Sequence, residues 1–253
     1  QDSPPEKPSR VARGGVCAER RPSQGDQAPA IERGFAAADR EKVWRGEDNR
    51  IQHIYREELV MAARLRPYQT AGADWLAGKT TALLADQMRL GKSAQAITAA
   101  HRLWPANQHG LFIGVVCPAS VVPVWHEQFK SWWPGQQPNL HVASYDKVAR
   151  GAFDAFAFDV LILDEAHYLK NKDAVRTKKI LGDRCDRVGG LVWRAGAVWC
   201  LTGTPTPNHP AELWPVLRAL APETIQKGGA PMNYWSFVST YCKTKDNGFG
   251  QQI

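Results

Sequence analysis

Short apolar runs alternate with amphipathic segments along the chain from residue 65 onward. Apolar and β-branched runs of strand length predict strands over residues 81–85, 111–117, 140–144, 159–163 and 197–201. Helical spacing predicts helices over residues 68–77, 121–132, 211–220 and 234–241, and one that follows Gly91 and ends near residue 103. Strands that alternate with helices in this way form parallel sheets. We therefore expect an α/β fold with a mainly parallel sheet and helices on both faces.

Residues 1–50 differ from the rest of the chain, because they are rich in Pro, Gly, Ser, Arg and Glu and carry few large apolar side chains. Such a segment buries too little apolar surface to offset the entropy lost on ordering. Residues 51–64 are charged and mildly amphipathic, which predicts a helix that leads into the folded part. We expect a low-complexity, disordered arm over residues 1–50 and one folded lobe over residues 51–253.

The net charge and the cysteines narrow the class of protein. The formal charge of +7 at pH 7 suits a polyanionic partner without proving one. An odd number of cysteines without a CxxC pair indicates a reducing compartment: Cys17, Cys117, Cys185, Cys200 and Cys242. Cys117 and Cys200 lie in apolar runs, where a thiol acts as a small hydrophobic group. No stretch is long enough to cross a bilayer, so we expect an intracellular protein with no membrane partner.

The strand predicted at 159–163 ends in two carboxylates, Asp164 and Glu165. A buried parallel strand that ends this way presents a Mg²⁺-holding carboxylate beside a general base for phosphoryl transfer. The alternative is a strand end whose acids are merely solvated. His167 follows directly, either as a hydrogen-bonded structural residue or as a relay to another motif.

Gly91, Lys92 and Ser93 follow a predicted strand and open a predicted helix, as a phosphate-binding loop requires. There Lys92 would neutralise phosphate charge and the Ser93 hydroxyl would ligate Mg²⁺. The alternative is a helix start with an ordinary exposed lysine. Two positions depart from the full P-loop pattern, since Asp86 replaces its first glycine and Arg89 stands where related motors have glycine. The side chain of Arg89 must therefore point away from the phosphates or join them.

Five ordered motifs together resemble the first ATPase lobe of the SNF2 family, within helicase superfamily 2. They are Leu65-Arg66-Pro67-Tyr68-Gln69, residues 85–93, Cys117-Pro118-Ala119-Ser120 with Trp125, the DEAH box Asp164-Glu165-Ala166-His167 with Lys170-Asn171, and Leu201-Thr202-Gly203-Thr204-Pro205. The resemblance implies a RecA-like lobe of the P-loop NTPase class, with ATP at the carboxyl ends of the strands. Residues 237–242 and 248–250 look more like the annealing-helicase branch and its phage or bacterial relatives.

The resemblance also implies roles for single positions. Nucleotide contacts fall to Arg66, Gln69, Leu90, Gly91, Lys92 and Ser93, with Gln69 reading the adenine edge. DNA contacts fall to Pro118, Ala119, Ser120, Ser144 and Tyr145. Coupling between the nucleotide site and DNA falls to His167, Thr202, Gly203 and Thr204. Plainer alternatives are a strand-to-helix turn with Ser120 as N-cap, a packed Tyr145, and a Gly–Pro turn at 203–205. Trp125, Trp132 and Trp133 either stack on bases or, as their helical spacing favours, pack against the sheet.

The function implied by this resemblance is ATP hydrolysis with Mg²⁺, coupled to translocation on double-stranded or branched DNA in remodelling or annealing. Such an enzyme would work in the nucleus of a eukaryote, or in the cytoplasm or nucleoid if bacterial or phage. The family's arginine finger belongs to a second RecA-like lobe, in the same or another chain, which residues 1–253 do not include. We expect poor activity without it. The alternative is a non-catalytic module that binds DNA or a partner, and the sequence leaves open whether the chain is a fragment.

Limited proteolysis checks the predicted arm. A protease should remove the first 50 or so residues and leave a resistant core that begins between residues 51 and 65, because a chain without a core stays open to cleavage. Mass spectrometry of the resistant fragment gives the boundary. Protection of the N-terminal residues would contradict this interpretation of their composition.

Overall fold

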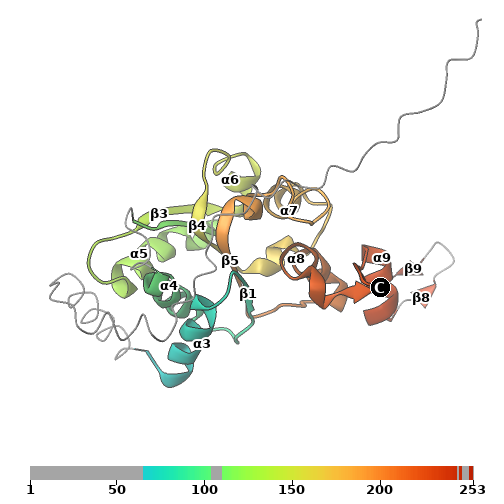
Figure 1. The fold of residues 1–253 in the computed structure, drawn as a ribbon, viewed down its shortest axis with the longest axis horizontal. Helices are drawn as coiled ribbons and strands as arrows, with labels where there is room; N and C mark the ends of the chain where they lie inside the picture. Colours follow the sequence, from blue (N-terminus) through green and yellow to red (C-terminus); the bar gives the residue numbers. More distant parts are fainter. Residues whose placement is uncertain (1–64, 104–109, 244, 247–250, 253) are drawn as a thin grey trace, which may run out of the picture.

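The computed structural model describes residues 65–103, 110–243, 245–246 and 251–252 (Figure 1). The arm predicted over residues 1–50 and the helix predicted over residues 51–64 lie outside this described part. No helix within it has both the length and the apolar character needed to cross a membrane.

A five-stranded, all-parallel sheet forms the centre of the fold, with the strand order β1-β5-β4-β2-β3. The strands are β1 (Thr81–Leu84), β2 (Phe112–Cys117), β3 (Asn139–Ser144), β4 (Phe158–Asp164) and β5 (Ala195–Leu201). Every strand predicted from the sequence is present within about two residues of its expected bounds. The predicted mainly parallel α/β fold is confirmed.

Helices cover both faces of this sheet (Figure 1). On one face lie α3 (Pro67–Ala77), α4 (Lys92–Leu103) and α5 (Val122–Trp132), and on the other α6 (Tyr145–Ala149), α7 (Val175–Leu181), α8 (Trp214–Leu220) and α9 (Tyr234–Tyr241). Alternate residues of β4 enter opposite cores: Ile162 packs with the first group, Leu161 and Leu163 with the second. Burial on both faces explains why the strands read as nearly continuous apolar runs.

Two features of the helices differ from the sequence-based expectation. The helix predicted over residues 211–220 starts as the 3₁₀ turn η5 (Pro210–Leu213) and becomes α-helical only at Trp214, where Pro215 occupies the first turn. The short helix α6 was not predicted, and α7 was expected only as a solvated helix face at Lys178 and Lys179 without bounds, because five and seven residues are too few to show helical periodicity.

Short connections complete the described chain. They are the 3₁₀ turns η2 (Ala119–Val121), η3 (Ala166–Leu169), η4 (Leu191–Arg194) and η6 (Pro222–Thr224), and the antiparallel pairs β6 (Gln226–Lys227) with β7 (Ala230–Pro231) and β8 (Lys245–Asp246) with β9 (Gln251–Gln252).

The interior thiols behave as the sequence predicted. Cys117 and Cys200 are fully buried in the two cores, and burial raises the pKa of each to about 12. A thiol with such a pKa stays protonated and unreactive near neutral pH.

Trp125 and Trp133 are also buried, so both pack in the core rather than stack on a ligand.

Close packing between β2 and β4 generates a stability prediction. A Cβ atom at Gly114 would lie 2.9 Å from three ring carbons of Phe158, so Gly114→Ala should lower the free energy of unfolding by about 1–3 kcal/mol through overpacking. The matched control is Gly78→Ala, because φ there is −87° and the nearest atom lies at 3.7 Å. Its effect should be small and stabilising. Urea unfolding measures both, and equal effects would contradict the prediction.

Candidate functional site

Three loops meet at the carboxyl edge of the sheet because β5 lies between β1 and β4. Residues 85–91, the phosphate-binding loop, follow β1. Asp164 ends β4 and Glu165 follows it, and these two residues begin the acidic loop. Residues 202–205 follow β5. In a parallel sheet all carboxyl ends face the same edge, which is where ligands bind in open α/β folds. The loop after β5 is therefore placed between the other two.

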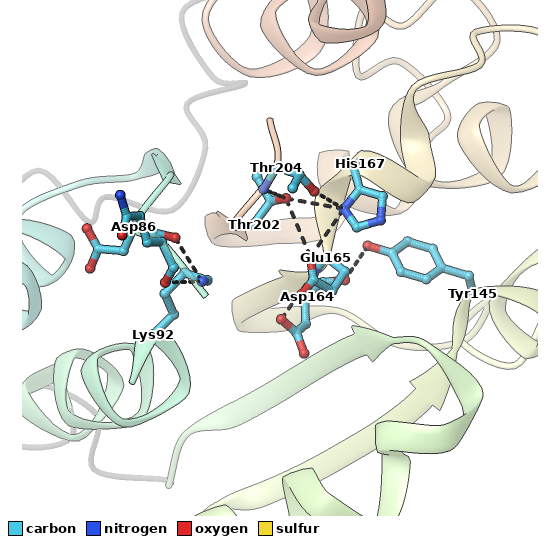
Figure 2. Close-up of polar contacts among 9 residues, drawn as sticks. Asp86, Lys92, Tyr145, Asp164, Glu165, His167, Thr202 and Thr204 are labelled. Atoms are coloured by element: carbon cyan, nitrogen blue, oxygen red, sulfur yellow. Dashed lines mark hydrogen bonds and ion pairs between the residues drawn. The ribbon is translucent and has the colours of Figure 1, made fainter. Parts of the chain in front are cut away.

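The loop after β1 wraps around the side chain of Lys92, the first residue of α4. The Lys92 ammonium donates hydrogen bonds to the carbonyl oxygens of Asp86 and Gln87, at 2.9 and 3.1 Å (Figure 2). Arg89 and Gly91 adopt left-handed φ angles of 68° and 76°. The left-handed φ explains why glycine suits position 89, and the Arg89 side chain is exposed.

Gln69 fastens this loop to the start of α3. Its side-chain oxygen accepts a hydrogen bond from the Arg66 backbone N–H at 2.9 Å, and its amide donates to the Leu90 carbonyl at 3.1 Å. A Cβ atom at position 91 would lie 2.4 Å from the Gln69 amide nitrogen, so only glycine fits there. The residues predicted to contact the nucleotide, Arg66, Gln69, Leu90 and Gly91, are thus brought together.

Gln95 is a residue of this site that the sequence analysis missed. Its side-chain amide donates to the Asp86 carboxylate at 2.9 Å, and Gln95 itself is fully buried. This bond gives Asp86, which replaces the first P-loop glycine, a structural role. A polar residue on the buried face of α4 was the available signal.

Asp164 is held by three contacts. The Trp125 indole N–H donates to one carboxylate oxygen at 2.8 Å, and the Glu165 backbone N–H donates to the other at 3.0 Å. The Tyr145 hydroxyl donates to the Asp164 carbonyl at 2.8 Å (Figure 2). Burial raises the pKa of Asp164, opposed by the Trp125 hydrogen bond and the nearby charge of Lys92. The two hydrogen bonds therefore orient the Asp164 carboxylate, and burial makes its ionised form unfavourable unless a cation lies nearby.

His167 joins the acidic loop to the loop after β5. Its Nδ1 atom lies 3.1 Å from a Glu165 carboxylate oxygen, 3.2 Å from the Thr202 hydroxyl and 3.4 Å from the Thr204 hydroxyl (Figure 2). Glu165 itself has a left-handed φ of 50°, which turns the chain sharply after β4. These contacts agree with both alternatives for His167, a hydrogen-bonded structural residue and a relay to another motif.

Gly203 brings the same loop against the phosphate-binding loop. A Cβ atom at this position would lie 2.8 Å from Met88 Cγ, 3.2 Å from the Met88 nitrogen and 3.6 Å from Lys92 Nζ. Only a residue without a side chain allows this approach. The loop at 202–205 therefore lies close to Met88 and Lys92 on one side and reaches Glu165 through His167 on the other.

The residues predicted to contact DNA fall into two groups. Ala119 and Ser120 are exposed and Pro118 is half-exposed, so this segment is open to a ligand. The alternative of Ser120 as an N-cap is wrong: Ser120 lies inside the 3₁₀ turn η2, and Val121 precedes α5 without a side-chain cap. Ser144 caps α6 instead, accepting from the Lys147 backbone N–H at 3.3 Å.

Ser144 and Tyr145 do not present their side chains to solvent, since only 6% and 2% of their surfaces are exposed. The Tyr145 ring stacks on Tyr168 with centroids 5.2 Å apart. The packed alternative for Tyr145 is what the structure shows, and its position beneath Asp164 makes it a support of the acidic loop.

A second missed residue, Glu212, ties the segment after residue 205 to the acidic loop. Its carboxylate accepts hydrogen bonds from the Lys170 ammonium at 2.9 Å and from the backbone and side-chain N–H groups of Asn208 at 3.0 and 2.7 Å. Burial opposes its ionisation, but these bonds outweigh burial and lower its pKa to about 2. Lys170, noted in the sequence only as part of a motif, thus has a defined partner.

Comparisons with known proteins agree with this arrangement. The SNF2-related domain family matches residues 68–153 and 147–246. The helicase swr-1 of Neurospora crassa is 32% identical over 206 residues, which is 68% of this chain and 10% of that protein. The SWI/SNF-related matrix-associated actin-dependent regulator of chromatin subfamily A-like protein 1 of Bos taurus is 31% identical over 218 residues, 78% of this chain and 21% of that protein. The chain therefore spans only about a tenth to a fifth of these curated relatives.

Solved structures support the fold. The Sulfolobus solfataricus SWI2/SNF2 ATPase core in complex with dsDNA superposes with a TM-score of 0.54 at 22% identity, covering 70% of this chain and 38% of that one. The Sulfolobus solfataricus SWI2/SNF2 ATPase core domain superposes with a TM-score of 0.53 at 24% identity, covering 70% of this chain and 37% of that one. Fold, motif order and family match agree: this chain belongs to the SNF2-related domain family and carries the first, RecA-like lobe of an SNF2-type helicase.

Proposed function

We propose that this chain is the ATP-binding lobe of a DNA-dependent ATPase that translocates on double-stranded DNA. The observation that carries the proposal is the position of the loop at 202–205, which lies beside Lys92 and is hydrogen-bonded to His167 next to Glu165. Gly203 lies against Lys92, while Thr202 and Thr204 reach Glu165 through His167. A site in which phosphate binding, the base and a third loop are in contact can transmit a change at one to the others.

The residues present fit Mg·ATP. Lys92 points into a loop of carbonyl oxygens at the start of α4, where phosphate oxygens would replace those carbonyls as its partners. Ser93 and Asp164 would hold Mg²⁺. Mg²⁺ takes one or two protein ligands and fills its remaining positions with phosphate oxygens and water.

Each remaining residue has a role that follows from its position. When bound, Mg·ATP supplies the phosphoryl group, and a cation beside Asp164 would oppose the effect of burial on its pKa. Glu165 would orient water and accept its proton, and His167 would hold the Glu165 carboxylate in place. Gln69 has one amide hydrogen beyond its bond to Leu90 with which to read an adenine edge.

We propose that DNA lies along the exposed segment 118–120 and the loop at 202–205. Both follow strands at the carboxyl edge, and the chain has a net charge of +7. A solved structure with the same fold is titled as a complex with dsDNA, which supports the choice of partner. The buried Ser144 and Tyr145 would act by shaping this edge. A DNA substrate implies an intracellular setting, in the nucleus if the source is eukaryotic.

A second RecA-like lobe, in a longer form of this protein or another chain, would complete the site. In enzymes where such an arginine has been tested, its loss slows phosphoryl transfer by roughly 10³–10⁵. We propose that residues 1–253 alone hydrolyse ATP slowly for this reason. Remodelling and annealing-helicase activity both remain compatible with the site.

Two substitutions separate binding from chemistry. In a protein that carries both lobes, Lys92→Ala should abolish ATP hydrolysis, because it removes the cation from the phosphates. Glu165→Gln should keep nucleotide binding and lose single-turnover hydrolysis by about 10²-fold or more, since an amide cannot accept the proton. The matched control is Lys130→Ala, an exposed residue of α5 paired with Glu127. Near-normal turnover in Lys92→Ala would refute the assignment of the loop.

DNA dependence tests the translocase proposal. Duplex DNA should raise the ATPase rate of the two-lobe protein, and the stimulation should weaken as salt rises, because phosphate contacts release counterions. The 253-residue chain alone should respond little. Strong DNA-dependent hydrolysis by this chain alone would overturn the incomplete-site argument. A two-lobe protein with no response to DNA would favour the non-catalytic binding module.

A further inference from the structure

A cavity of about 520 Å³ lies on the face of the sheet that carries α7, α8 and α9. Its walls come from the loop before α7, the loop after α7, the exposed side of α8 and the start of α9. None of the residues assigned above to nucleotide, Mg²⁺, DNA or coupling lines it. Its volume is in the range of ligand-binding pockets.

One wall of this cavity is aromatic and rigid. Tyr234 packs edge-on against Trp214 and Trp235, with ring centroids 5.6 and 5.4 Å apart. The Trp214 indole N–H donates to the Met232 carbonyl at 3.0 Å, which fixes that ring, and Asn233 caps the helix that carries the other two. Trp235 nevertheless leaves 62% of its surface in solvent. An exposed ring on a fixed support is typical of a binding anchor.

The same cavity carries positive charge that has no ion-pair partner. Arg218 is half-buried and Arg184 is exposed, and neither makes an ion pair or a hydrogen bond with any described residue. Lys172 is neutralised by Asp173 at 2.7 Å. A half-buried guanidinium without a carboxylate favours an anionic ligand, since Arg binds carboxylates through two parallel hydrogen bonds.

A second hollow of about 300 Å³ continues the first, and Asp183 lines both. It exposes two valines, Val175 and Val188, with 71% and 62% of their surfaces in solvent. Lys178 lies beside them, also without an ion pair among the described residues. The two hollows thus adjoin at Asp183, and together they expose apolar side chains and cations that make no ion pair among the described residues.

We propose that this surface binds an acidic peptide segment of a partner protein, with apolar side chains interspersed among its carboxylates. Arg218 and Arg184 take the carboxylates, while Trp235 and the two valines take the apolar side chains. A nucleic-acid strand fits less well. A phosphate backbone offers nothing to the exposed valines, whereas a peptide can carry apolar side chains between its carboxylates. The site would attach a partner to the lobe without touching the nucleotide edge.

Fluorescence anisotropy tests the proposal with the 253-residue chain and a labelled peptide of about twelve residues, in which pairs of glutamates separate single leucines and phenylalanines. Arg218→Glu should weaken binding of this peptide about tenfold or more, as expected for reversal of a central charge. Lys130→Glu, the same change on the opposite face, should leave it unchanged. Trp235→Ala should weaken binding several-fold, whereas Trp75→Ala, an exposed tryptophan of α3, should not.

Two further probes decide between ligand classes. The same peptide with lysine for glutamate, and a single-stranded oligothymidylate of about twelve nucleotides, should bind weakly and should not displace the acidic peptide. Displacement by the oligothymidylate, equal losses in Arg218→Glu and Lys130→Glu, or no peptide binding would each overturn the proposal. If Arg218→Glu lowers the melting temperature sharply, Arg184→Glu and Trp235→Ala carry the test, because both positions are exposed.

Discussion

The parallel pairing of β5 between β1 and β4 is the constraint on which the rest of the site depends. It brings the loop at 202–205 between the phosphate-binding loop and the acidic loop, although the first of these lies more than a hundred residues earlier in the sequence. Burial of both sheet faces holds this order, because β4 and β5 send alternate side chains into two separate cores. A shift of β5 by one residue would send each of its side chains into the other core, where the packing is built for a different side chain.

Polar contacts then set the geometry of the edge. Asp164 is fixed by Trp125 from one core and Tyr145 from the other, so the acidic loop is anchored on both faces of the sheet. By contrast, Glu165 is held through His167 and two threonine hydroxyls of a neighbouring loop. The carboxylate expected to hold a metal is rigidly placed, whereas the expected base depends on where the loop at 202–205 lies. In the proposed coupling of the nucleotide site to DNA, this difference would let the base move with the loop at 202–205 while the metal-holding carboxylate stays in place.

Backbone strain gathers in two places, at the carboxyl edge of the sheet proposed to bind the nucleotide and in the loop after α7. Among the described residues, four non-glycine positions have left-handed φ angles: Arg89, Glu165, Cys185 and Arg187. The first two belong to the nucleotide edge, and the other two lie in the loop after α7, where Cys185 lines the larger cavity. Each such residue costs on the order of 1 kcal/mol, so the surrounding contacts must hold it. Surrounding contacts must therefore hold the backbone of the loop after α7 in a strained conformation, as they do in the loops at the carboxyl edge of the sheet.

The sequence by itself determined the strands, most of the helices, the order of the motifs and the place of Lys92, Asp164 and Glu165 at element ends. These depend on local periodicity and on residue types at loops, which a single chain displays directly. Only the tertiary structure decided which loops meet, that Gln95 and Glu212 anchor them, and that Tyr145 is buried. It also assembled the cavity beside α9 from four segments. Such features depend on strand order and on contacts between distant residues, and a sequence pattern carries neither, because strand pairing is set by packing of the whole core.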